Sequence, residues 1–420
     1  MFKMTPPPFR SSVMACACAG MLLATAVHAQ ENNPYYAGAT VNTTSNSNIY
    51  LSRPEHAQSD TITSAGLRVG LDQSIGRQQL VADLGINANR YSSATKNNNT
   101  SYNLSSYLNW ETIERLSGTL TLGASQARSE DNSTATATNP SPDLNLLRSH
   151  QANFQARLGS VTQLTFEAGL AMSQNKYSAL AYQSGNMHQQ AFNAGVRFRP
   201  SSESSLWLGE RHTSARYPNY SVVSEDRVGR NDIDLIGNMT FSADSAVNAR
   251  ISLTRESHSA IATRDSRGWT GALGWTVQPT GKLKFGLNLS RDSSVGATDY
   301  AFNLVSATTN FDKNDTNISS KFGLTGEWSA TALLSVTAGW SYTHRTLDSS
   351  FTTSLLNGAS GTDNTSAVNL GLRYVPLRNV ELGCNVAWTD RKASDEVVLA
   401  ALTYPYKVTT TSCYGQVYLR

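Results

Sequence analysis

The sequence predicts an all-β protein that closes into a transmembrane, antiparallel up-and-down β-barrel of about eighteen strands. The prediction depends on the alternation of apolar and polar residues, on very short turns that alternate with long polar connections, and on an apolar leader before them. The mean hydropathy is only -0.34. A barrel is compatible with this value because its strands show lipid only every second side chain.

The alternation is clearest at 283–290, where Leu or Phe takes every second position and Lys, Gly, Asn and Ser take the others. The same period places an apolar face outward at 80–86, 154–158 and 192–198. A soluble β-sandwich or β-helix is the alternative, but it would need a second buried face, which these strands do not show. The tryptophans that share the outward parity, as in the aromatic girdles of barrels, are Trp110, Trp269, Trp275, Trp328, Trp340 and Trp388.

The connections predict the strand number. Eight short turns join sixteen strands, and one more strand at each end places both termini in the periplasm, which gives eighteen. We expect the first strand within 35–50 and the last from about 407 to 420. The short, periplasmic turns are 73–77, 112–115, 159–162, 199–202, 242–245, 278–281, 329–331 and 375–379, and long extracellular loops include 129–145, 218–229, 293–315, 346–363 and 392–406.

The N-terminus predicts secretion. Lys3 and Arg10 precede a small and apolar segment, and Val-His-Ala ends at residue 29. We therefore expect residues 1–29 to be a cleaved signal peptide and 30–420 to be a barrel in the bacterial outer membrane. Only Cys384 and Cys413 remain after residue 29. On the last hairpin both would face outward near one level, either as a cross-strand disulfide or as two small apolar residues.

Charge and motif spacing exclude several classes of function. With 34 basic and 31 acidic residues the formal charge is +3, and no basic stripe with interleaved aromatics predicts a nucleic-acid partner. No cysteine, histidine or carboxylate spacing predicts a zinc or EF-hand site, so we expect no metal and no cofactor. Asp312, Asp315 and Asp363 could touch divalent ions between lipopolysaccharide molecules, but a solvated loop explains them as well.

Two histidine and serine pairs could act as base and nucleophile in a lipid hydrolase. They are His212 with Ser214, and His258 with Ser259. In loops this rich in serine such proximity arises by chance, and no third member is evident. The chain is therefore predicted not to be an enzyme.

The predicted lumen carries charges of both signs. They either pair across neighbouring strands and keep the interior hydrated, or form a mixed-charge path for a hydrated polymer or solute. Mixed signs argue against steep selection of small ions. The candidate lumen residues are Arg68, Asp83, Arg157, Glu167, Arg197, Arg199, Arg211, Arg250, Lys284, Lys321 and Arg373, with Asp72, Glu111, Asp232, Asp234, Glu256, Glu327 and Glu381 as further acidic members.

Several segments, in the same order over nearly the whole mature chain, resemble the EpsL family of outer-membrane barrels. That family is associated with exopolysaccharide gene clusters, often beside exosortase and PEP-CTERM systems. The chain ends in Val417-Tyr418-Leu419-Arg420, whereas many outer-membrane barrels end in an aromatic residue. The segments that carry the resemblance are Ser59-Asp60-Thr61-Ile62, Ile75-Gly76-Arg77-Gln78, 102–112, 116–120, Arg216-Tyr217-Pro218, 230–235, 275–283 and Ser290-Arg291-Asp292.

The resemblance implies a porin-like protein that takes part in exopolysaccharide biosynthesis or export and provides or supports a passage for the polymer. Its expected partners are outer-membrane lipid, lipopolysaccharide, exopolysaccharide and other components of an export machinery. The alternatives are a general diffusion porin for small solutes and a non-conducting scaffold or adhesion barrel. The resemblance carries over no catalytic residues.

Overall fold

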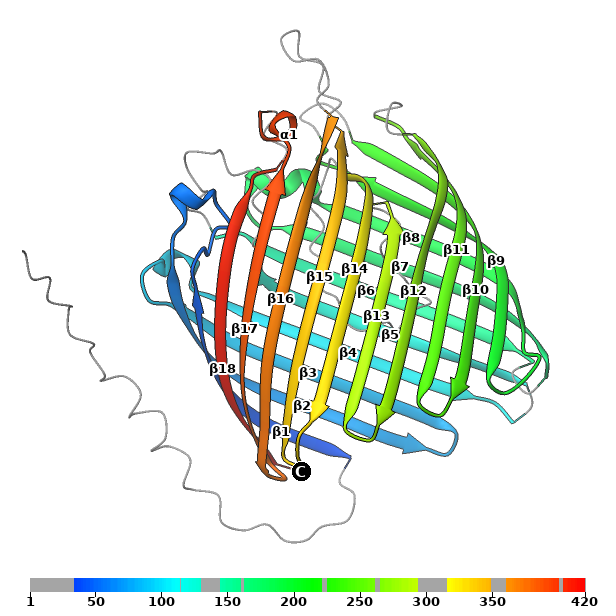
Figure 1. Ribbon diagram of the computed structural model, residues 1–420. Coiled ribbons are helices and arrows are strands. Elements are labelled where there is room, and N and C mark those ends of the chain that lie inside the picture. Colours follow the sequence, from blue (N-terminus) through cyan, green and yellow to red (C-terminus); the bar gives the residue numbers. More distant parts are fainter. Residues whose placement is uncertain are drawn as a thin grey trace, which may run out of the picture. The chain divides into compact units, whose positions relative to one another are not determined.

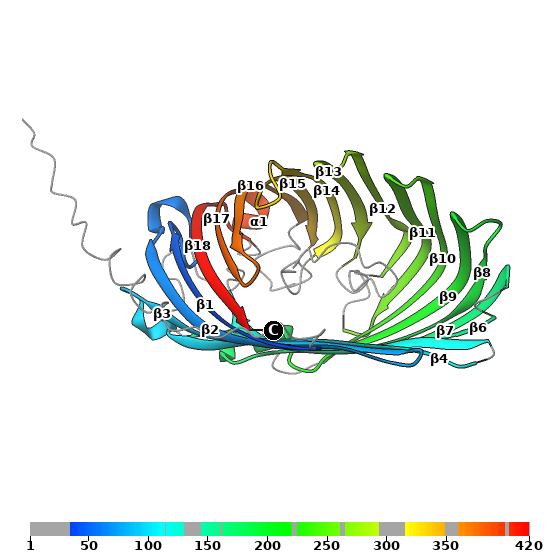
Figure 2. The same cartoon turned by 90° about the horizontal axis from the view of Figure 1, so that it is seen from below.

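The chain folds into one closed antiparallel sheet of eighteen strands (Figure 1). The computed structural model describes residues 34–113, 115–129, 144–159, 162–220, 225–260, 265–293, 316–348, 360–399 and 403–419. Each strand pairs with its neighbours in sequence, and β1 (Tyr35–Asn46) pairs with β18 (Tyr406–Leu419), which closes the ring seen in Figure 2. The predicted fold class and strand count are therefore confirmed. The predicted signal peptide, 1–29, lies outside the described residues.

The other strands are long enough to cross a bilayer, where a tilted strand needs about 9–11 residues. No helix in the described ranges is both long and apolar enough to cross a membrane. The remaining elements are β2 (Asp60–Ile75), β3 (Gln78–Tyr91), β4 (Asn99–Glu111), β5 (Leu116–Arg128), β6 (Leu146–Leu158), β7 (Leu164–Tyr177), β8 (Met187–Phe198), β9 (Ser204–Tyr217), β10 (Asp226–Ser242), β11 (Ser245–His258), β12 (Ser266–Thr280), β13 (Leu283–Asp292), β14 (Thr316–Ser329), β15 (Leu334–Asp348), β16 (Ser360–Leu377), β17 (Val380–Ala393), η1 (Pro54–His56), η2 (Thr95–Asn97), η3 (Leu180–Gly185) and α1 (Asp395–Leu399).

The strands on either side of all eight short turns end where the sequence predicts, and these strand ends lie together at one end of the barrel, toward the lower and right-hand edges of Figure 1. Four of these turns have only two residues between strands, at 76–77, 243–244, 281–282 and 378–379. Gly76 has φ +61, a left-handed conformation that tight hairpins require and glycine adopts without strain. The opposite ends of the strands, together with α1, lie at the other end. Short turns mark the periplasmic end of such barrels, and long loops mark the extracellular end.

The outer surface is apolar and the inner surface polar. Leu67, Phe166 and Leu253 are 67%, 61% and 63% exposed, whereas Arg230 is fully buried. This is the reverse of a soluble protein, and an exposed apolar belt on a closed sheet is the property of a transmembrane barrel. A soluble sandwich is wrong, because all eighteen strands of the described residues belong to one closed ring.

The tryptophans follow the same division. Five of the predicted outward tryptophans are exposed, and Trp110 stacks on the outward Phe154 with ring centroids 6.3 Å apart. The seventh, Trp207, is only 4% exposed and faces inward. Its indole lies on β8 and β9, because a Cβ atom added at Gly195 or Gly209 would stand 2.6 or 2.4 Å from the ring. These two glycines therefore make room for an aromatic surface inside the barrel.

Cys384 and Cys413 form a disulfide between β17 and β18. They are directly opposite in register, with Cα atoms 4.1 Å apart. Both share the outward parity of Leu382 and Trp388, so the bond lies on the apolar face. Of the two alternatives left by the sequence, the disulfide is the one present.

The disulfide can be tested by counting thiols. We expect the chain from residue 30 onward, unfolded without reductant, to take up no alkylating reagent, and after reduction to take up two equivalents. Intact mass measures both. Cys413→Ser is the control, because it should leave Cys384 reactive without reduction. Full labelling of the unreduced wild type would show that the bond does not form.

Candidate functional site

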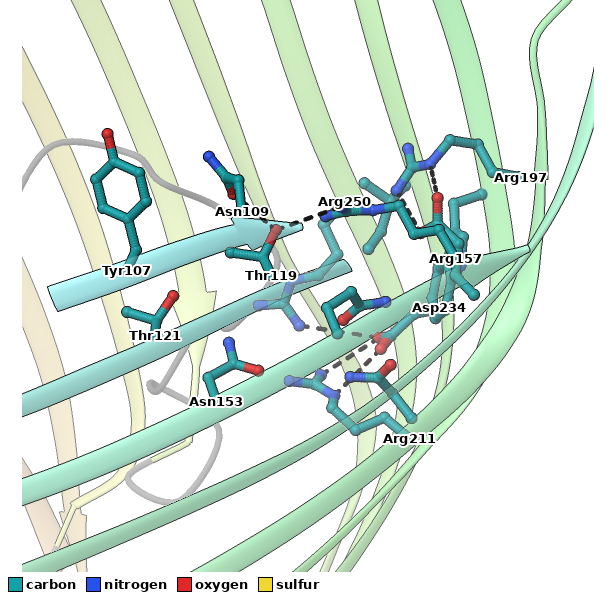
Figure 3. A pocket seen from close by; sticks show the side chains of 15 residues that line it. Tyr107, Asn109, Thr119, Thr121, Asn153, Arg157, Arg197, Arg211, Asp234 and Arg250 are labelled. Carbon is teal, nitrogen blue, oxygen red and sulfur yellow. Dashed lines mark hydrogen bonds and ion pairs between the residues drawn. The ribbon is translucent and has the colours of Figure 1, made fainter. Parts of the chain in front are cut away.

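The candidate site is the inner wall of the barrel. A cavity of about 520 Å³ opens on the inner faces of β4 to β11 (Figure 3). Six of the predicted lumen residues lie together there: Arg157, Glu167, Arg197, Arg211, Asp234 and Arg250. The rest of the lining is mostly amide, hydroxyl and aromatic, and consists of Tyr107, Asn109, Thr119, Thr121, Asn153, Gln155, Asn193, Trp207 and Ile236.

The cavity has more cationic than anionic side chains. Arg197 forms a two-pronged ion pair with Glu167, with N–O distances of 2.6 and 3.0 Å. Arg211 and Arg250 both point toward Asp234, at 3.1 and 4.0 Å (Figure 3). Four arginines and two carboxylates thus line the cavity, and Arg211 and Arg250 also bind Asp232 and Asp292, which are outside the lining.

Arg157 accounts for part of this excess. It lies opposite Glu167 in register, but the Glu167 carboxylate binds Arg197 from the neighbouring strand on its other side. Arg157 instead donates from Nη1 to the Thr119 hydroxyl at 3.4 Å. No carboxylate among the described residues pairs with it. Its guanidinium can therefore bind an anionic group that enters the cavity.

Arg199 lies beside the cavity, with Nη2 3.9 Å from Glu167 and Nη1 hydrogen-bonded to Thr165. The region around Glu167 thus concentrates three arginines, Arg157, Arg197 and Arg199, on β6 and β8 and just beyond β8.

The other predicted lumen residues lie apart from the cavity. Arg68 pairs with Asp83 at 2.8 Å, where Tyr36 also donates to the carboxylate. Arg373 pairs with Glu381 at 2.6 Å. On the neighbouring part of the wall, Lys284 is opposite Glu327 and Lys321 is opposite Thr343 in register.

A larger buried ionic cluster crosses the inner faces of β9 to β13. At its centre Asp292 accepts from Arg230 Nη1 and from Arg250 Nη2, each at 2.7 Å. Arg230 also pairs with Asp232 at 2.8 Å, and Arg211 reaches the same carboxylate at 3.2 Å. All five of these side chains are at most 10% exposed.

The cluster continues where the chain leaves β13. Ser293 accepts from Arg230 at 2.7 Å and donates to Glu256 at 2.6 Å. Arg230 is on β10, three strands from β13, and Glu256 is on β11, two strands from it. Asp292 and Ser293 therefore connect the extracellular end of β13 to these two strands. Asp232, Asp234 and Glu256 were predicted from the sequence as lumen residues, whereas Arg230 and Asp292 were not. Arg230 lies two residues before Asp232 on the same strand, so the alternation places both on the same face and could have identified Arg230 as a lumen residue.

The histidines lie in two different surroundings. His212 is on the outer face and bonds Asn231 at 2.7 Å. His258 is at the inner wall, and its two ring nitrogens contact Asp226 and Glu256 at 2.9 and 3.1 Å. Both ring nitrogens of His258 therefore contact carboxylates.

The sequence predicts Asp363 in a solvated loop, and this prediction is wrong. Asp363 lies on β16, is fully buried, and forms an ion pair with Arg345 on β15, directly opposite in register. The strands β15 and β16 extend further toward the extracellular end than their polar composition indicated. Asp312 and Asp315 lie outside the described residues, and no group of three or more potential metal ligands occurs within the described part.

No protein-family model and no curated protein matches the chain. Among solved structures, the chain is similar to Pseudomonas aeruginosa OpdK with vanillate (13% identity, TM-score 0.49, covering 92% of this chain and 99% of that one). A second structure, of the outer membrane protein OpdK from the same organism, gives 13% identity, a TM-score of 0.46 and coverages of 92% and 99%. The structure of Acinetobacter baumannii OccAB3 gives 8% identity and a TM-score of 0.47, and the match covers 92% of this chain and 99% of that one. The likeness concerns the barrel fold.

Proposed function

We propose that the protein is an outer-membrane channel for small hydrated solutes, with a preference for anionic ones. The observation that carries this proposal is the arginine excess in the cavity, above all Arg157. Barrels of sixteen to eighteen strands are wide enough for an aqueous passage. The apolar belt would seal the barrel in lipid, while the polar wall would replace part of the hydration shell of a passing solute.

The selectivity of such a passage would be moderate. Three of the four cavity arginines already have carboxylate partners, so the lumen does not present a ring of a single sign. An anionic solute would exchange water for the Arg157 guanidinium and for hydroxyl and amide groups such as those of Thr121 and Asn153. A cation would meet the local positive excess. The passage would lower a barrier without chemistry.

Solute uptake by vesicles tests the proposal. Vesicles that contain the refolded protein should admit gluconate faster than glucose and glucose faster than glucosamine, as measured by osmotic swelling. Arg157→Gln should reduce the advantage of gluconate by roughly twofold to fivefold, because it removes the cation without a carboxylate partner. Lys284→Gln is the matched control, since it removes an inner-wall cation outside the cavity. Vesicles impermeable to all three solutes would contradict the channel and favour a scaffold.

Passage of an exopolysaccharide is the second candidate function. The resemblance to EpsL barrels supports it, and so does the lining of amides and hydroxyls around Tyr107 and Trp207, because such groups hydrogen-bond and stack on sugars. The partners would then be the polymer and other components of an export machinery. Deletion of the gene should abolish surface polysaccharide while intracellular precursor persists. Normal secretion, with growth defects on particular nutrients, would leave the small-solute channel as the function.

A further inference from the structure

Cationic side chains lie in a band on the outside of the barrel near its extracellular end. Strands β6, β7, β9, β10, β11 and β12 each carry one within four residues of that end of the strand. All are exposed. We name these six residues the outer basic band: Arg148, Lys176, Arg216, Arg227, Arg255 and Arg267.

The band faces away from the lumen. Arg148 shares its parity with Phe154, Arg255 with Leu253, and Arg267 with Trp269, and these three apolar side chains are 40%, 63% and 58% exposed on the lipid face. The alternate residues of the same strands point inward. The outer basic band therefore stands directly above the apolar belt, on the extracellular side.

In the strand register, the six residues of the outer basic band form three pairs of like charge on neighbouring strands. Arg148 is opposite Lys176, Arg216 is opposite Arg227, and Arg255 is opposite Arg267. Like charges directly opposite each other on neighbouring strands destabilise a sheet. Three such pairs on one continuous part of the wall therefore need a counter-charge.

Within the described residues, a carboxylate supplies that counter-charge to one of the three pairs. Glu225, just before β10, accepts from Arg216 and Arg227, each at 2.6 Å, and these bonds hold the pKa of its carboxyl below the usual value. In the described part of the chain, no carboxylate forms a salt bridge with Lys176, Arg255 or Arg267. Across the barrel, by contrast, Lys407 on β18 has a carboxylate 3.8 Å away, at Asp390.

The surroundings of the band fit a lipid headgroup. Directly below the Arg255–Arg267 pair, Arg291 lies over the Trp269 ring at 5.1 Å, which marks the interface between apolar and charged surface. A molecule at this height can place acyl chains against the belt and anionic groups against the band. Arginine forks bind phosphate through two parallel hydrogen bonds, and basic clusters at a membrane surface bind anionic headgroups.

We propose that the outer basic band binds the phosphate groups of the phosphorylated glycolipid, lipid A, in the outer leaflet. The lipid phosphates would lie between the paired cations of neighbouring strands and supply the missing counter-charge. This binding takes place on the outer surface between β6 and β12 and does not depend on what passes through the lumen.

Lipid retention by the purified protein tests the proposal. The mature chain in detergent is mixed with bisphosphorylated lipid A, with dephosphorylated lipid A or with phosphatidylglycerol, and bound lipid is counted by native mass spectrometry. The wild type should retain the bisphosphorylated lipid preferentially. Arg255→Gln/Arg267→Gln should retain it roughly tenfold more weakly, as expected when charge-assisted hydrogen bonds are lost. Arg90→Gln/Lys407→Gln is the matched control, on β3 and β18 at the same end of the barrel.

A second readout separates lipid binding from a purely structural role. Without lipid, Arg255→Gln/Arg267→Gln should unfold at the same temperature as the wild type or a higher one, because the repulsion between the two arginines is gone. With bisphosphorylated lipid A the wild type and the control should gain clearly more stability than the double variant, because the variant binds the lipid more weakly. Equal retention by the double variant, or equal retention of either of the other two lipids by the wild type, would overturn the proposal.

Discussion

Replacing Asp292 by alanine is expected to lower the free energy of unfolding of the barrel by about 3–5 kcal/mol, the usual cost of breaking a buried ion pair from one side. Asp292 binds two guanidiniums at once, those of Arg230 and Arg250. Both arginines are buried, with Arg230 fully inaccessible. Without the carboxylate, two cations would stay in the wall with fewer partners, and the end of β13 would lose its ion pairs with β10 and β11.

Equilibrium unfolding in urea, followed by tryptophan fluorescence in detergent micelles, measures the effect. Asp292→Asn should be less damaging than Asp292→Ala, because the amide oxygen can still accept one hydrogen bond. Asp244→Ala, in the exposed turn between β10 and β11, is the matched control and should change the free energy by less than about 0.5 kcal/mol. If Asp292→Ala behaved like this control, the ionic cluster would not stabilise the barrel.

The strand number and the faces of the strands could be predicted from the sequence for a physical reason. A shift of one residue would turn every apolar side chain of a strand into the lumen, so the period fixes which face meets lipid. The two-residue turns fix where each strand reverses. Even β1 fell within the predicted window, although its Asn and Thr residues blur the alternation.

The partners of the inward residues could not be predicted in the same way. Periodicity says that Arg157 and Glu167 face the lumen, but the Glu167 carboxylate binds Arg197 on the other neighbouring strand. The contact between Asp292 on β13 and Arg230 on β10 depends on the curvature of the wall, which the alternation does not encode. Trp207 points inward because two glycines on the neighbouring backbone accommodate the indole, and only the structure reveals that fit.

The ion preference of the lumen follows from the same local pairings. Changing both Arg197 and Arg199 to glutamate should convert an anion-preferring channel into a cation-preferring one. The two cations near Glu167 would become two more carboxylates, so the local potential changes sign. We expect the ratio of anion to cation permeability to fall roughly fivefold or more at low salt, and less at 1 M salt, where screening is strong. The reversal potential in a planar bilayer under a salt gradient measures this ratio.

A charge swap separates this effect from damage to the fold. Glu167→Arg/Arg197→Glu keeps one cation and one anion at the same two positions, which are neighbours on β7 and β8. It should leave the reversal potential close to that of the wild type, because the local net charge is unchanged. Steady conductance with an unaltered reversal potential in Arg197→Glu/Arg199→Glu would mean that ions pass elsewhere in the lumen. Since selectivity depends on the potential along the path of the ions, such a result would place the permeation path away from the cavity and remove the basis for assigning anion preference to Arg157.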